Sequence, residues 1–249
     1  MYSKEISQDF LWYSYFGITA SDAEESREKA AYRCANRAYR DACRKLSFAV
    51  STSKLDGMRK EAAAKKKSGD IEGSKKIADE VKTHTELKQR FRKDTNEYIV
   101  SALLNLKGEY DDVHRTICMT VINRAKAYQG LFDDPLTFGI AQKWVNMTVK
   151  NMLVMGLWND ELSRYSGKLH IPIDSYLITA VRRELGIHAN SEEYFNKSPW
   201  SGIAVDQADQ YYAYQRAIRE KLRKIDSKRT PLEWEHEMWI REAKEHENT

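Results

Sequence analysis

The sequence has 249 residues, a formal net charge of +4 and a hydrophobic fraction of 41%, enough for one large or two modest domains with a real core. Its three scattered cysteines argue against a cysteine-held metal cluster, and their odd number argues against a disulfide scaffold. Without a signal-peptide pattern or an apolar run near the roughly 20 residues of a membrane span, the chain is expected to be soluble and cytoplasmic, with no membrane partner.

Helix-forming residues (Ala, Lys, Glu, Arg and Leu) dominate the stretches between the four prolines, which we expect at joints between elements. In chain order, helices are predicted from Ser21 or Asp22 towards Phe48, then over 57–68, 71–93, 97–106, 113–122, 140–155, 176–185, 206–224 and 231–246. No segment shows the alternation of a half-buried strand. The sequence therefore predicts an all-α fold.

Basic residues are concentrated between positions 54 and 94. This stretch has 13 Lys and Arg against 8 Asp and Glu, a surplus of five positive charges. Such a pattern fits a solvated helical hairpin, and it also fits a contact with the DNA backbone. The sequence leaves both readings open.

Lys143 is a candidate nucleophile. We expect it in the first turn of the helix over 140–155, where unpaired N–H groups and the positive end of the macrodipole gather. That setting disfavours a second positive charge and so favours the free amine that attacks a carbon centre. An ordinary solvated lysine is the alternative.

Asp174 is a candidate catalytic carboxylate. It stands where the apolar run at 169–173 ends and the next predicted helix begins, so it could simply cap that helix. Pro172 restricts the backbone just before it and would fix the direction of the carboxylate. A capping role and a catalytic role are compatible, because a cap is rigid.

The surroundings of these two residues resemble a known family. Gly139-Ile140-Ala141-Gln142-Lys143 is similar to the second half of the helix-hairpin-helix in DNA glycosylases of the endonuclease III and 8-oxoguanine glycosylase superfamily. Ile171-Pro172-Ile173-Asp174-Ser175-Tyr176 resembles the family's apolar-Val-Asp-Thr-His segment, with Ala141 and Ser175-Tyr176 as departures. The family's four-cysteine iron–sulfur motif is missing, which points to cluster-free relatives such as the archaeal 8-oxoguanine glycosylase.

The resemblance implies a two-lobed helical fold with a helix-hairpin-helix and an interlobe cleft. We expect one lobe from 1–53 with 160–249 and the other from 54–159, in a monomer that binds double-stranded DNA without metal or cofactor. Lys143 would be the nucleophile and Asp174 the essential carboxylate. Gly139, Ala141 and Gln142 would lie in the hairpin that holds a phosphate.

The family's chemistry implies excision of a base followed by abasic-site lyase cleavage, with an oxidised purine or a hypermodified phage base as substrate. Residues that could contact the base are Trp144, Asn146, His170, Trp200 and Tyr211, although each residue type is more often a packing residue. Trp234 and Trp239 are predicted to anchor the last helix in the core. Two other functions stay open: a helix-hairpin-helix module that binds DNA without catalysis, and a helical interaction protein from a phage or a defence system.

Overall fold

The fold is all-α, as the sequence predicts. The computed structural model describes residues 4–157, 162–195 and 199–247. Its helices are α1 (Lys4–Phe16), α2 (Ala20–Glu25), α3 (Arg27–Ala42), α4 (Thr52–Lys67), α5 (Ile71–Leu104), α6 (Tyr110–Lys126), α7 (Phe138–Val154), α8 (Ser175–Ala180), α9 (Ala208–Ile225) and α10 (Pro231–Glu247). Within these described ranges there is no strand, and a single isolated bridge joins Phe48 to Phe132.

Helix α1 is not among the predicted elements, and two predicted stretches are divided or joined differently in the structure. The helix expected to run from Ser21 or Asp22 towards Phe48 is divided at Ser26, whose extended backbone ends α2 and whose hydroxyl caps α3. The segments expected as separate helices over 71–93 and 97–106 form one helix, α5, which ends at Leu104. No glycine or proline interrupts 94–97, so nothing in the chain stops the helix there.

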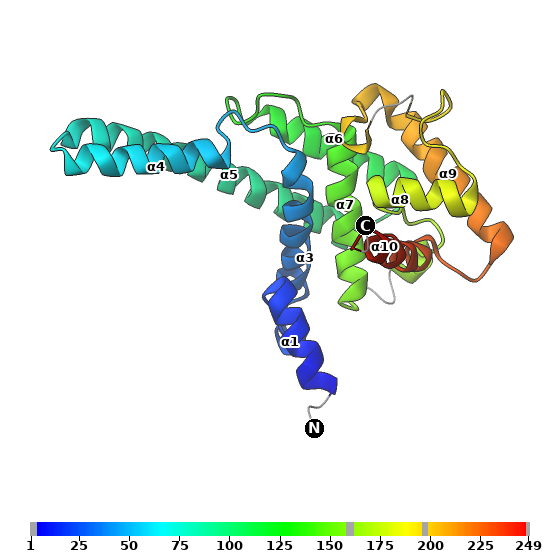
Figure 1. Cartoon of the computed structure of the whole chain (residues 1–249). Coiled ribbons are helices and arrows are strands. Elements are labelled where there is room, and N and C mark those ends of the chain that lie inside the picture. The colour runs from blue at the N-terminus through cyan, green and yellow to red at the C-terminus, as the bar shows by residue number, and fades with distance from the viewer. Residues whose placement is uncertain (1–3, 158–161, 196–198, 248–249) are drawn as a thin grey trace.

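Helix α7 is the centre of the main core. It packs against α3 along most of its length and against α6 on another side, and Figure 1 shows it upright in the middle of the molecule. The indole of Trp144 is fully buried and donates to the Ala35 carbonyl at 3.2 Å and to Asn96 Oδ1 at 3.1 Å. The core thus joins residues of both predicted lobes, and the boundary between the lobes stays a prediction.

Helix α4 and the first half of α5 form an antiparallel hairpin, which we call the arm. Figure 1 shows the arm extending to one side, well beyond the other helices. It has a small core of its own, made by Val50, Leu55 and Val81 with Met58 and Ile77 packed against them. In the part of the chain that the structure describes, no helix is long and apolar enough to cross a membrane.

Candidate active site

Lys143 lies in the second turn of α7. The helix begins at Phe138, because Thr137 caps it with a hydroxyl that accepts from the Ile140 N–H at 3.2 Å. The prediction that Lys143 lies in the first turn is therefore wrong by two residues, and the macrodipole acts on it less than expected. Only 7% of Lys143 is exposed, so it is not the solvated lysine of the alternative reading.

Asp174 caps α8, as predicted, and its other carboxylate oxygen pairs with Lys143. One carboxylate oxygen, Oδ1, caps α8 by accepting from the Leu177 N–H at 2.9 Å. The other, Oδ2, lies 2.5 Å from Lys143 Nζ. The two side chains are 9% and 14% exposed, so the ion pair lies just beneath the surface. The cap fixes the carboxylate, and the carboxylate in turn holds the lysine.

The segment Trp200–Gly202 packs tightly on the start of α7. A Cβ atom at Gly139 would lie 1.8 Å from the Trp200 carbonyl oxygen, so only glycine permits this approach. The Gly139 N–H donates to the Ile203 carbonyl at 3.0 Å, and the Thr137 hydroxyl donates to the Ser201 carbonyl at 2.7 Å. These contacts bring the Trp200 ring centroid to 5.7 Å from Lys143 Nζ, within the range of a cation–π contact.

Gln142 connects the lysine helix to the aspartate segment. Its side-chain amide donates to the Gly139 carbonyl at 2.9 Å and to the Ile173 carbonyl at 3.2 Å, so it holds the backbone immediately before Asp174. Ala141 is buried in the core, and its N–H donates to the Thr137 carbonyl. These three residues lie in the first two turns of α7 and not in the hairpin where they were expected. Because their polar groups have protein partners in this conformation, the phosphate contact expected at Gly139, Ala141 and Gln142 stays a prediction.

Three of the residues expected near the base form one buried polar network. The Asn146 side chain donates to the Tyr211 hydroxyl at 2.8 Å, and His170 Nδ1 lies 3.1 Å from the same hydroxyl. His170 Nε2 lies 2.8 Å from Asp111 Oδ1, while Arg219 donates to Asp111 Oδ2 at 2.9 Å. Asn146, His170 and Tyr211 are at most 1% exposed. They therefore do not line an open pocket, and their hydrogen bonds join α7 to the neighbouring buried segments.

Electrostatics keep this network in one protonation state. Burial lowers the pKa of His170 to about 4, although the Asp111 carboxylate opposes the shift. Burial alone would raise the pKa of Asp111, but hydrogen bonds and charge from His170 and Arg219 outweigh it and hold this pKa well below its usual value. A neutral imidazole between a hydroxyl and a carboxylate is therefore the state at pH 7.

A second lysine–carboxylate pair, which the sequence does not reveal, adjoins the first. Lys150 Nζ lies 2.8 Å from Glu235 Oε1, and the Glu235 side chain is 1% exposed. Burial raises the pKa of Glu235; Lys150 opposes this shift, and Asp174 adds to it. The first pair is therefore close enough for its charges to act on Glu235. Glu235 is hidden in the acidic sequence of α10, whose spacing gives no sign of a buried charge.

Trp234 and Trp239 differ in burial. Trp234 is 4% exposed, as predicted for a core anchor, whereas Trp239 is 39% exposed. The prediction for Trp239 is wrong, because its ring lies over the amine of the partly buried Lys150, 5.6 Å from Nζ to the centroid. Each lysine of the two pairs thus has an indole beside it, Trp200 for Lys143 and Trp239 for Lys150.

Two surface cavities lie away from this site. One, of 260 Å³, is lined by Asp111, Lys168, Arg219 and their neighbours, and the other, of 240 Å³, lies between the ends of α9 and α10. Neither has Lys143 or Asp174 in its lining. Comparisons of the chain with protein families, with curated proteins and with solved structures find no match.

Proposed function

We propose that this protein is a DNA glycosylase with abasic-site lyase activity, which acts through a Schiff base on Lys143. One observation carries the proposal: Lys143 and Asp174, 31 residues apart in the chain, meet at 2.5 Å between Nζ and Oδ2. Both were selected from the sequence for their motif contexts. The resemblance of those contexts to the helix-hairpin-helix glycosylases adds the reaction class.

The pair has the groups that the reaction needs. Asp174 Oδ2 accepts a proton from Lys143, whose free amine attacks C1′ of the extruded nucleotide. The bond from C1′ to the base breaks, and the base leaves with the proton that Asp174 took from Lys143. The carboxylate restored in this way stabilises the positive charge that develops on the sugar. The sugar ring then opens to give an iminium on Lys143. Loss of a C2′ proton breaks the C3′–O bond and releases the 3′ phosphate.

The proposal also includes the helix-hairpin-helix and the interlobe cleft that the resemblance implies. Helices α6 and α7, with residues 127–137 between them, would be the helix-hairpin-helix, and the cleft between the two lobes would open at Lys143. Trp200 already lies beside the Lys143 amine, so its ring is placed to stack on an extruded base. The base would be an oxidised purine or a hypermodified phage base.

A DNA-binding module without catalysis is the second candidate function. The ion pair itself favours this function. Asp174 balances the charge of the buried Lys143, so the burial of this lysine is explained without a catalytic role. In that case Lys143 would hold the site together or contact a phosphate. The interaction protein of a phage or a defence system would be a further case of the same class. Only the enzyme would form a covalent bond with DNA, and so a test for that bond separates it from these two candidates.

The experiment is borohydride trapping on duplex DNA with one abasic site. An imine between Lys143 and C1′ is reduced to a stable secondary amine, so the enzyme yields a covalent protein–DNA adduct. We expect the adduct with the wild type and with Lys107→Gln, a control at an exposed lysine away from the site, and none with Lys143→Gln. Absence of an adduct with the wild type, or full yield with Lys143→Gln, would refute the proposal.

A further inference from the structure

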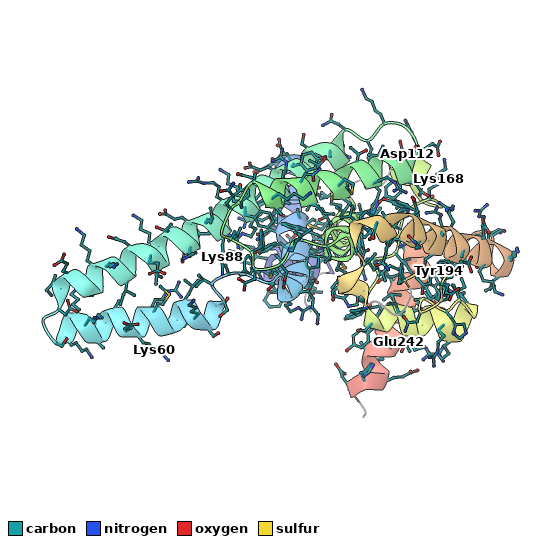
Figure 2. The ribbon with its side chains drawn as sticks, turned by 90° about the horizontal axis from the view of Figure 1, so that it is seen from above. Lys60, Lys88, Asp112, Lys168, Tyr194 and Glu242 are labelled. Carbon is teal, nitrogen blue, oxygen red and sulfur yellow. The ribbon has the colours of Figure 1, made fainter. Side chains whose placement is uncertain are left out.

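Contacts between α4 and α5 hold the arm together. Besides its small apolar core, the Ser74 hydroxyl donates to the Ala62 carbonyl at 2.7 Å, which ties α5 to α4. At the base, Lys88 Nζ donates to the Val50 carbonyl at 2.6 Å. Figures 1 and 2 both show the two helices side by side and free of the other elements along most of α4. The arm therefore exposes most of its surface.

The net positive charge of the chain lies in residues 54–94, which are the arm and the part of α5 that joins it to the body. Residues 54–94 contain 13 of the 41 Lys and Arg side chains but 8 of the 37 Asp and Glu side chains. The rest of the chain is left with 28 basic and 29 acidic residues, which is close to neutral. A polyanion is therefore attracted to residues 54–94 by their net charge.

Within the arm the excess lies on α4. This helix has six basic side chains and two acidic ones, Asp56 and Glu61. Arg59 pairs with Asp56 at 2.6 Å and Lys65 with Asp70 at 2.9 Å. Lys60, Lys66 and Lys67 are exposed and have no acidic partner within the described residues. In Figure 2, Lys60 lies on the side of α4 that faces away from α5.

The shape and chemistry of α4 fit duplex DNA. Its sixteen residues make a rod of about 24 Å, along which one DNA strand passes about seven phosphates. An anionic membrane fits less well, because an interfacial helix needs an exposed apolar face and the apolar face of α4, with Leu55 and Met58, packs against α5. We infer that the arm is a DNA-backbone contact, made by Lys60, Lys66 and Lys67.

This inference extends the proposed function, since it assigns the main electrostatic anchor of the DNA that Lys143 would act on. The two can nevertheless fail separately. Binding through the arm needs no Schiff base, and it can be measured on undamaged DNA, which gives Lys143 no abasic aldehyde to attack. A protein that binds through the arm but yields no borohydride adduct would refute the glycosylase and leave the arm's role intact.

The test compares two variants with the same change in net charge. In the arm variant, Lys60, Lys66 and Lys67 become Gln. In the control variant, the exposed lysines Lys107, Lys221 and Lys224 of the body become Gln. Binding of the full chain to a labelled, undamaged duplex of about three helical turns is followed by fluorescence anisotropy over a range of salt concentrations, and circular dichroism checks that each variant keeps its helices.

The salt dependence gives the answer. Each lost phosphate contact lowers the slope of log K against log salt by about 0.9, so the arm variant should lose between about two and three units of slope. The control variant should keep the wild-type slope. An unchanged slope in the arm variant, an equal drop in the control, or tighter wild-type binding to phosphatidylserine vesicles than to DNA would overturn the inference.

Discussion

The contact between Lys143 and Asp174 can be measured as a free energy in a double-mutant cycle. The perturbations are Lys143→Gln, Asp174→Asn and the two together. Asn still accepts the Leu177 N–H and caps α8 about as well as Asp, so the cap contributes little to the difference. What each single substitution removes is the partner of a charge that is 9% exposed on the lysine side and 14% on the aspartate side.

The magnitude follows from this burial. Breaking a fully buried ion pair costs about 3–5 kcal/mol, because the remaining charge has no partner. The Lys143–Asp174 pair is slightly exposed, and the Trp200 ring lies near the amine, so we expect about 2 kcal/mol for either single substitution. The double variant leaves no orphan charge and should cost little more than one single variant. The coupling energy is then about 2 kcal/mol.

Urea unfolding at neutral pH, followed by circular dichroism, gives the four free energies of unfolding. Substitutions that do not interact are additive within about 0.3–0.5 kcal/mol. A coupling energy no larger than that would mean that the two side chains do not meet in solution. The geometric basis of the proposed active site would then be lost, whatever the activity of the variants.

Two further predictions concern the supports of the site. Gly139→Ala should destabilise the protein by about 2 kcal/mol or more, because its Cβ would collide with the Trp200 carbonyl oxygen; Gly57→Ala, inside α4 with open space around it, is the matched control and should cause no loss in urea unfolding. His170 should make stability fall at acid pH, because the unfolded chain takes up a proton near pH 6.5 and the folded chain only near 4. The contribution of His170 is complete above the unfolded pKa and falls by about 3 kcal/mol as pH drops through this window, and the buried His114 and the half-buried His236, whose pKa values are also lowered, add to the fall. Free energies of unfolding at pH 7 and pH 4.5 for the wild type and His170→Gln isolate the contribution of His170, and an equally steep fall in His170→Gln would contradict the assignment.

The fold class and the main pair could be predicted from the sequence because their signals are local. Helix formers, proline positions and the cap at Asp174 each act within a few residues, and so most of the predicted helices overlap observed ones and α8 starts after Asp174 as expected. Helix α1 was missed. The start of α7 was missed by two residues because Thr137, not the glycine turn, supplies the capping hydroxyl.

The remainder of the site depends on contacts between distant segments. Glu235 is 85 residues from its partner Lys150 in the sequence. Nothing in the Glu-rich sequence of α10 distinguishes it from its exposed neighbours. The role of Gly139 is likewise set by the Trp200 carbonyl oxygen from a separate segment. Such tertiary contacts leave no spacing pattern that a single sequence can show.

The central claim is that Lys143 forms a Schiff base with DNA, and locating the trapped adduct on the chain tests it most directly. Wild-type protein is reduced with borohydride on abasic-site DNA, digested with nuclease and protease, and mapped by tandem mass spectrometry. We expect a deoxyribose-derived mass addition on the peptide that contains Lys143, at the Lys143 side chain. An addition confined to another lysine, or no modified peptide at all, would contradict it.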